Sequence, residues 1–239
     1  MHVRHQIGVL SKVSSLFLVP DNHLGRATVS SVAVAHEVEA MGGRCIACLN
    51  ARDRNLLGFR RDLLTAAAYG VDQFLLVYGD KPVAGARTGE LTVRAMLKEL
   101  RTFSSRPETA DDPFRAGVTT RLTPMPSWKQ QADFLFVQVG FDVDQLLQWR
   151  EGVTFDGPVY AGVMVLASAA MATKLSAQLP EVRVPPRLVE RIDADPHAGV
   201  DFACEQVLAI RDADAFDGVH LIPVSRYREV AARLESQLA

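Results

Sequence analysis

The amino-acid sequence predicts an α/β fold, in which strands of a parallel sheet alternate with helices. Seven short apolar runs have the length and composition of buried strands. Almost all of them are separated by segments with the apolar spacing of amphipathic helices. No linker is long enough to divide the 239 residues, so we expect a single domain over residues 1–239.

The same alternation favours a TIM-type (β/α)8 barrel, a fold that typically needs about 250 residues. An eighth strand would have to come from residues 2–10. Too few residues separate that segment from Ser15 for a covering helix. The expected barrel therefore has an atypical or missing first β/α unit.

Taken in order, each predicted strand is an apolar run bounded by polar or turn-forming residues. The predicted strands are 15–19, 44–49, 74–77, 114–122, 134–139, 159–166 and 218–224. The predicted helices repeat apolar residues at intervals of three and four. They are 28–41, 56–67 closed by Gly70, 88–103, a short piece at 126–132, 143–150, 168–179, a piece from Pro185, 199–211 and 226–238. The polar segment 104–113 is expected to be a loop.

Composition narrows the class of protein. A formal net charge of −2 gives no electrostatic reason to expect nucleic acid or an anionic membrane as a partner. No apolar segment reaches the roughly 20 residues needed to span a bilayer, and no signal peptide is evident, so a cytoplasmic protein is expected. Cys45 and Cys48 form a C-x-x-C inside a predicted strand, whose alternation points them to opposite faces and favours buried thiols.

One stretch, Ala47–Pro82, places a carboxylate where ligands bind in α/β folds. It predicts a strand, a polar loop, an amphipathic helix, a second strand and a Gly-Asp turn. Asp80 lies just past the second strand, at the sheet edge where barrel and open α/β proteins carry their chemistry.

The same stretch, ARDRNLLGFRRDLLTAAAYGVDQFLLVYGDKP, resembles the methylenetetrahydrofolate reductase family, a flavin-dependent barrel of one-carbon metabolism. The family has a strand ending in T-C-R-D-R-N or a relative, a helix, and a strand ending in R-G-D or T-G-D. The similarity continues through FLFVQVGFDVDQLLQW, VYAGVMVLASAAMATKL, VRVPPRLVERID and GVHLIPVSR. It covers roughly Leu16 to Ala232.

The resemblance implies roles for particular residues. Asp80 would be the carboxylate near the flavin and the central nitrogens of the folate, and Gln138 would hydrogen-bond the pterin ring. Leu175 stands where the family commonly has an aromatic against the aminobenzoyl ring of the folate. Asn50 and Asp53 would line the folate site after the preceding strand, in a loop that also carries Arg52 and Asn55.

Where the family motif differs from this chain, the resemblance implies substitutes. The first-strand glutamate that acts as general acid has no counterpart, so Asp21 or His23 would take its place. Cys48 lies where the family often has a histidine, and Tyr78 replaces the arginine before the turn. Tyr78, Gly79, Asp80 and Cys48 are the residues expected to contact a cofactor. The implied cofactors are FAD and NAD(P)H, with tetrahydrofolate as the substrate moiety.

Each of these residues also has a purely structural interpretation. Asp80 could cap a nearby helix or bond local amides. Gln138 could be a core amide with a satisfied partner, although an amide in an apolar strand is costly to bury alone. Residues 51–55 could form a solvated loop, Asp21 could cap a loop, and His220 in the last strand could be a core histidine.

Three functions follow as hypotheses. The first is reduction of 5,10-methylenetetrahydrofolate to 5-methyltetrahydrofolate by NAD(P)H, through FAD or without flavin. The second keeps the folate site but carries out methyl transfer or demethylation. The third is a partner-dependent or non-catalytic subunit that binds folate or flavin and completes its barrel as a homo- or hetero-oligomer.

Overall fold

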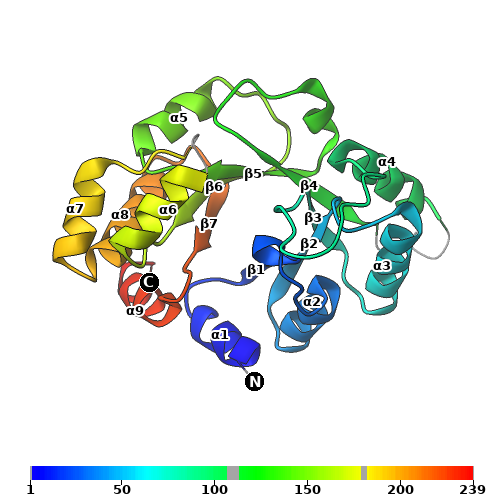
Figure 1. Ribbon diagram of the computed structural model, residues 1–239, viewed down its shortest axis with the longest axis horizontal. Helices are drawn as coiled ribbons and strands as arrows, with labels where there is room; N and C mark the ends of the chain where they lie inside the picture. The colour runs from blue at the N-terminus through cyan, green and yellow to red at the C-terminus, as the bar shows by residue number, and fades with distance from the viewer. Residues whose placement is uncertain (1, 107–112, 179–181, 239) are drawn as a thin grey trace. The chain divides into compact units, whose positions relative to one another are not determined.

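The computed structural model describes residues 2–106, 113–178 and 182–238 (Figure 1). The described residues form an α/β fold with seven strands that alternate with helices, which is the arrangement of a TIM-type barrel. It divides into two compact units. Unit 1 consists of Met1–Val13, Thr120–Met125 and Leu135–Ala239, and unit 2 consists of Ser14–Thr119 and Pro126–Phe134. The single domain expected from the sequence stays a prediction.

Unit 2 contains the first four strands, which are parallel neighbours in the order β1 to β4. Its elements are β1 Leu16–Val19, the 3-10 turn η1 His23–Gly25, α2 Ser31–Ala40, β2 Arg44–Asn50, α3 Leu56–Ala68, β3 Gln73–Val77, α4 Val93–Ser104, β4 Arg115–Thr120 and η3 Ser127–Gln131.

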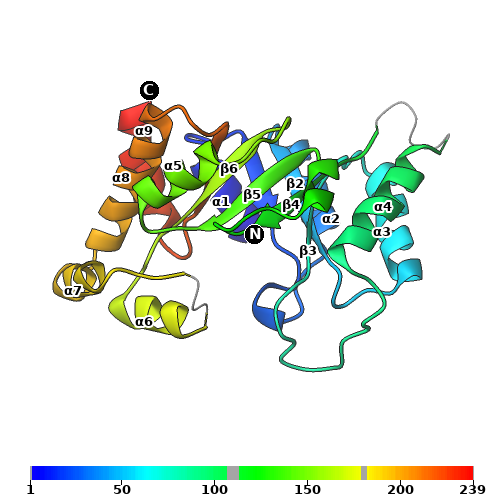
Figure 2. The ribbon, with the colours of Figure 1, turned by 90° about the horizontal axis from the view of Figure 1, so that it is seen from above.

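The core of unit 2 forms because α3 and α4 each bury one apolar face. Helix α4 packs on β3, and α3 packs on α4 (Figure 2). The ring of Phe114 lies 5.0 Å from that of Phe74 and 5.7 Å from that of Phe103. Both helices begin at a side-chain cap: Asn55 accepts from the N–H of Gly58 at 2.8 Å and Thr92 from that of Ala95 at 3.1 Å.

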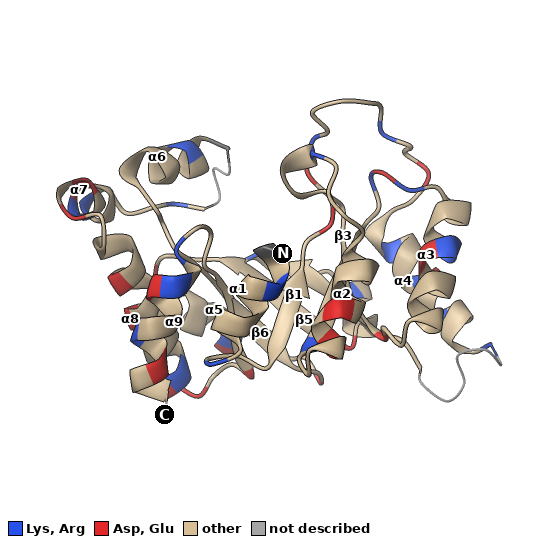
Figure 3. Cartoon of the chain, turned by 90° about the horizontal axis from the view of Figure 1, so that it is seen from below, with Lys and Arg blue, Asp and Glu red and all other residues tan. Residues whose placement is uncertain are grey.

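Unit 1 contains the last three strands, again parallel neighbours in sequence order. Its elements are α1 His2–Leu10, β5 Phe134–Val139, α5 Val143–Glu151, β6 Val159–Met164, α6 Ala169–Gln178, α7 Pro186–Ala194, α8 Ala198–Asp212, β7 Gly218–Ile222 and α9 Tyr227–Leu238. Helices α8 and α9 both carry acidic and basic residues (Figure 3), and Arg233 of α9 forms an ion pair with Asp201 of α8.

Residues 2–10 are a helix, so the suggestion that they supply an eighth strand is wrong. Three of their four apolar residues, Val3, Ile7 and Leu10, recur at intervals of four and three, which places them on one helical face. Helix α1 packs on α9, and Ile7 is 6% exposed there. The atypical first unit expected from the sequence is confirmed: the described chain supplies seven strands and begins with a helix.

Two predicted helices begin later than their apolar spacing suggests. Helix α2 begins at Ser31 rather than Thr28, and α4 begins at Val93 rather than Thr88. Both threonines are instead hydrogen-bonded within loops. The predicted loop at 104–113 lies largely outside the described residues. Among the helices that the structure describes, none has the length and apolar character needed to cross a membrane.

Candidate functional site

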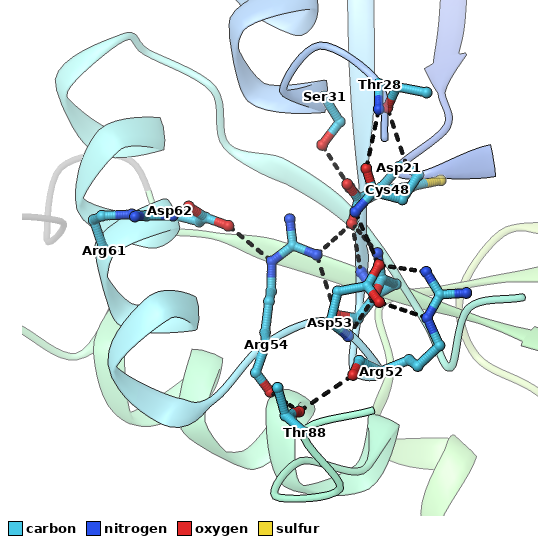
Figure 4. Close-up of polar contacts among 12 residues, drawn as sticks. Asp21, Thr28, Ser31, Cys48, Arg52, Asp53, Arg54, Arg61, Asp62 and Thr88 are labelled. Atoms are coloured by element: carbon cyan, nitrogen blue, oxygen red, sulfur yellow. Dashed lines mark hydrogen bonds and ion pairs between the residues drawn. The ribbon is translucent and has the colours of Figure 1, made fainter. Parts of the chain in front are cut away.

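The loops after β1, β2 and β3 all lie at one edge of the sheet of unit 2, because these strands are parallel neighbours. This is the carboxyl edge, where α/β proteins bind ligands. Polar and charged side chains from the three loops meet there, and Figure 4 labels six of them: Asp21, Thr28, Arg52, Asp53, Arg54 and Thr88. We call this group of loops the carboxyl-edge cluster; it comprises residues 20–30, 50–55 and 78–90.

Asp21 anchors the loop after β1. Its side chain is 5% exposed, and its Oδ2 accepts from the backbone N–H of Asn50 at 2.9 Å and from the Asn50 side-chain amide at 2.6 Å. Arg54 forms a hydrogen-bonded ion pair with the same oxygen. Since each of these groups donates to the carboxylate, Asp21 ties the β1 loop to the end of β2.

Asn50, the last residue of β2, is fully buried and bonds in two directions. Its amide nitrogen donates to Asp21, and its Oδ1 accepts from the backbone N–H of Asp53 at 2.9 Å. Gly79 packs against it with φ of +95°, and a Cβ there would lie 3.0 Å from that of Asn50. A glycine therefore fits this position for both its backbone conformation and its size.

Arg52 and Asp53 form a two-bond ion pair at the centre of the cluster. Arg52 Nε donates to Asp53 Oδ1 at 2.5 Å, and its Nη2 pairs with Oδ2. The hydrogen bond from Arg52 is the main cause that lowers the pKa of Asp53, and Asn22 adds a bond of 2.8 Å. Arg52 is only 2% exposed, and its Nη1 is buried with no hydrogen-bond partner among the residues described.

Arg54 joins two carboxylates from different elements. It pairs with Asp21 through Nη1 and with Asp62 of α3 through Nε at 2.8 Å. Its side chain is 13% exposed. Burial opposes the charged form, but the bonds to Asp21 and Asp62 outweigh it and raise the pKa of Arg54. Nothing in the sequence singled out Arg54, because an exposed loop arginine and a buried ion-paired one look alike in a polar run.

Asp80 lies on the exposed side of the cluster and holds the β1 loop. Its Oδ2 accepts from the backbone N–H of Leu24 at 2.8 Å. Leu24 has φ of 55°, an uncommon conformation for a residue with a side chain. Next to it, the carbonyl oxygen of Gly25 accepts from the N–H of Val83 at 3.0 Å, so a backbone hydrogen bond also joins the two loops.

The remaining residues expected to contact a cofactor differ in accessibility. The side chain of Tyr78 is exposed, and the guanidinium of Arg87 lies 5.8 Å from its ring centroid. Cys48 is 6% exposed, and burial raises the pKa of its thiol. The position of Asp80 and Tyr78 suits contact with a ligand, whereas Cys48 is enclosed by its neighbours. In the described ranges, no group of three or more His, Cys, Asp and Glu could hold a metal ion.

In unit 1 the predicted ligand residues are Gln138 and Leu175. Gln138 is half-buried in β5, and its Oε1 accepts from the N–H of Val139 at 3.1 Å. Leu175 of α6 packs against an apolar cluster that includes Phe141 and Leu166. The ring centroid of His220 in β7 lies 5.0 Å from that of Phe136, with the two rings nearly perpendicular. Burial lowers the pKa of His220 to about 4.

Three small polar residues complete the carboxyl-edge cluster, and none of them was predicted to be a catalytic or binding residue. Asn22 and Thr28 exchange hydrogen bonds of 3.1 and 3.2 Å across the β1 loop. Thr88 donates its hydroxyl to the carbonyls of Arg52 and Arg54 at 3.2 and 2.7 Å. Both threonines lie at the start of an apolar helical pattern, so periodicity assigned them to helices.

Known proteins resemble this chain in sequence over part of its length and in fold over nearly all of it. Residues 128–236 match the family model for methylenetetrahydrofolate reductase. No curated protein matches the sequence at a significant level.

Two solved structures illustrate the likeness in fold. An uncharacterized protein from Clostridium thermocellum that binds two copies of 5-methyl-5,6,7,8-tetrahydrofolic acid has a TM-score of 0.66 at 10% identity, covering 99% of this chain and 88% of that one. An active-site mutant of Rhizomucor miehei beta-1,3-glucanosyltransferase in complex with laminaritriose has a TM-score of 0.50 at 12% identity, covering 92% and 79%. At such low identity these structures show the fold alone.

Proposed function

We propose, from the match of residues 128–236 to the methylenetetrahydrofolate reductase family model, that this chain belongs to that family, binds a reduced folate and acts in folate-dependent one-carbon metabolism. The observation that carries the proposal is the family match over residues 128–236, which includes the strand that bears Gln138. The fold shared with a protein that binds 5-methyl-5,6,7,8-tetrahydrofolic acid supports the same ligand class.

The reaction we propose is reduction of 5,10-methylenetetrahydrofolate to 5-methyltetrahydrofolate by NAD(P)H. The bond between the methylene carbon and N10 breaks, N10 takes up a proton, and the methylene carbon receives a hydride. One NAD(P)H becomes NAD(P)⁺ for each folate reduced. A positioned acid and correct alignment of donor and acceptor are the two requirements that the protein has to meet.

Asp80 is the carboxylate that we assign to contact the folate ring. It is exposed at the carboxyl edge, and its position is fixed by the bond from Leu24. Asp21, the other carboxylate predicted to be catalytic, is buried and engaged by Asn50 and Arg54. We therefore assign proton transfer to Asp80 rather than to Asp21. The role that we assign to Asp21 is to position the loop after β1.

Gln138 is proposed to bond the pterin ring, since its amide nitrogen can donate while its oxygen accepts from the backbone of Val139. Leu175 supplies an apolar contact of the kind that a benzoyl ring needs, because it lies on an apolar cluster of unit 1. Asn50 and Asp53, predicted to bind substrate directly, are proposed to act by fixing the loops around Arg52.

Flavin binding is supported by fewer residues. Tyr78 and Asp80 are exposed and able to meet a planar cofactor, whereas the buried Cys48 thiol is not. A flavin, when bound, would accept hydride from NAD(P)H and pass it on. The roles given above to Asp80 and Gln138 are the same whether hydride arrives from a flavin or directly from the nicotinamide.

The test is to measure oxidation of NADH and of NADPH by the purified protein, with and without 5,10-methylenetetrahydrofolate and added FAD. We expect oxidation that requires the folate, with 5-methyltetrahydrofolate identified by mass spectrometry as the product. The visible spectrum of the purified protein will show whether flavin is bound. A protein that binds 5-methyltetrahydrofolate but is inert in every combination would overturn the reduction and leave methyl transfer or demethylation and the partner-dependent subunit as the alternatives.

A further inference from the structure

One guanidinium nitrogen of Arg52 is left without a hydrogen-bond partner among the described residues. Nε and Nη2 are both committed to Asp53, while Nη1 is buried and without a hydrogen-bond partner within the described residues. Leaving a buried donor unpaired destabilises the folded protein, and more so when the group is charged. An arginine that is 2% exposed is therefore held at a cost that a bound acceptor would remove.

The surrounding contacts fix this donor in one direction. The backbone N–H of Arg52 donates to the carbonyl of Tyr78 at 3.0 Å, which extends the pairing of β2 with β3 by two residues. The carbonyl of Arg52 accepts from both the N–H and the hydroxyl of Thr88, at 3.1 and 3.2 Å. Asp53 accepts hydrogen bonds from the other two guanidinium nitrogens. Figure 4 shows the guanidinium of Arg52 directed away from Asp21 and Arg54.

The charge around Arg52 decides what kind of acceptor it suits. Asp53 already neutralises Arg52, and Asp80 and Asp21 also act on its charge and raise its pKa. Arg54, the second guanidinium of the network, is shared between Asp21 and Asp62. Three carboxylates, Asp53, Asp80 and Asp21, thus act on the Arg52 guanidinium, so a further anion there would be repelled and a neutral carbonyl oxygen would not.

We propose that Arg52 Nη1 donates a hydrogen bond to a neutral carbonyl oxygen on a heterocyclic ligand. This inference rests on the proposed function, which makes that ligand a reduced folate and the acceptor the carbonyl of its pterin ring. Arg52 is then a binding residue that selects ligands with an acceptor at that ring position. Side chains that enclose Nη1 have to move aside for the ligand to reach it.

The test compares two probes in calorimetric titrations: tetrahydrofolate, which has the ring carbonyl, and its 4-amino analogue, which has a donor in its place. The variants are Arg52→Gln and Arg52→Lys, with Arg61→Gln as control because the side chain of Arg61 is 77% exposed. We expect both Arg52 variants to lose about 10- to 100-fold in affinity for tetrahydrofolate, as for one charge-assisted hydrogen bond. The affinity of both Arg52 variants for the 4-amino analogue should change by less than about threefold.

The outcomes separate the two proposals. If the unaltered protein binds neither probe, the proposed function fails and the inference fails with it. If it binds tetrahydrofolate and the Arg52 variants bind equally well, or lose both probes alike, the inference alone is overturned. Should both variants unfold, nitrogen NMR of arginine-labelled unaltered protein decides: a buried guanidinium resonance must shift with tetrahydrofolate and not with the 4-amino analogue.

Discussion

Asp80 links a loop contact to a proposed chemical role through a single side chain. One of its oxygens holds the N–H of Leu24 in place. Substitution by alanine would remove the loop contact and the charge together. Substitution by asparagine keeps an acceptor oxygen of the same size and removes the charge, so it separates the two effects.

We predict that Asp80→Asn lowers kcat for folate-dependent NAD(P)H oxidation by about 100-fold or more, the usual range for loss of a general acid–base group. The unfolding free energy should change little, because the bond to Leu24 is kept. Steady-state kinetics and urea denaturation measure the two quantities, with the exposed Asp156→Asn as control. Unchanged kinetics would remove Asp80 from the reaction.

The ion pair between Arg54 and Asp21 is mostly buried, so breaking it leaves a carboxylate in a poorly solvated place. We predict that Arg54→Met lowers the unfolding free energy by about 3–5 kcal/mol. Arg61→Met is the matched control: Arg61 pairs with Asp62 but is 77% exposed, and such pairs contribute about 0–1 kcal/mol. Equal losses in urea denaturation would contradict the prediction.

His220 makes stability depend on pH. Burial lowers the pKa of His220 from 6.5 to about 4, so the folded chain resists a proton that the unfolded chain accepts. The stabilisation is therefore present above about pH 6.5 and is lost as the pH falls toward 4. Asp53 and Glu229, whose pKa values are lowered by hydrogen bonds from Arg52 and Arg226, also lose stability in acid, so the comparison has to be made with a variant.

We predict that the unaltered protein loses about 1–2 kcal/mol more unfolding free energy between pH 7 and pH 5 than His220→Phe does. Phenylalanine keeps a ring beside Phe136 and does not titrate. His36→Phe replaces an exposed histidine that stacks on Tyr69 and serves as the control. If the unfolding free energies of the unaltered protein and of His220→Phe depend on pH in the same way, the pKa of His220 is not lowered by folding.

The loops after β1 and β3 pack backbone against backbone. Gly25 has φ of +70°, and a Cβ there would lie 2.0 Å from the carbonyl oxygen of Lys81. Gly42, at the end of α2, has a comparable φ of +84°, and an added methyl group there would meet nothing within 4 Å. The two glycines therefore share a backbone requirement, and only Gly25 has a steric one as well.

We predict that Gly25→Ala costs about 1–3 kcal/mol more unfolding free energy than Gly42→Ala, because the added methyl group forces the two loops apart. Gly42→Ala alone should cost about 1–2 kcal/mol, as expected for a left-handed backbone with a side chain. Urea denaturation of both variants makes the comparison. Equal costs would show that the loops part without strain.

The elements of the chain were largely predictable, and the exceptions have a physical cause. Apolar periodicity located the strands and helices because burial imposes it. Thr28 and Thr88 continue that periodicity, but their hydroxyl groups bond the backbone of the loops instead. The sequence also placed Asp80 at the strand end, whereas the bond to Leu24 joins residues 56 positions apart and leaves no local signal.

At the scale of the whole molecule, the alternation of predicted strands and helices was enough to predict the α/β class. It did not predict that α1 is a helix. A segment of nine residues with four apolar positions fits a short strand or a short helix, and packing on α9 selects the helix. The pairing of Arg54 with both Asp21 and Asp62 was equally unpredictable, since it depends on the packing of a loop against two other elements.

If the chain binds a reduced folate, the ligand should stabilise the folded protein as a whole. At 100 times its Kd a ligand adds about 2.7 kcal/mol, which corresponds to a rise in Tm of about 5–10 °C for a chain of this size. We predict such a rise with 5-methyltetrahydrofolate in a thermal-shift measurement. Para-aminobenzoylglutamate, which lacks the pterin, should leave Tm unchanged; an equal rise with both would assign the binding to the tail.

The pairing of α1 with α9 has a consequence for how the chain folds as it is synthesised. Lys12, just after α1, pairs with Glu235 at 3.2 Å, and His5 lies 2.8 Å from a guanidinium nitrogen of Arg228. On the ribosome, α1 emerges long before α9 exists, whereas unit 2 is made in between from residues that largely pack on one another. Unit 2 can therefore fold during translation, while α1 waits for the last helix to leave the exit tunnel.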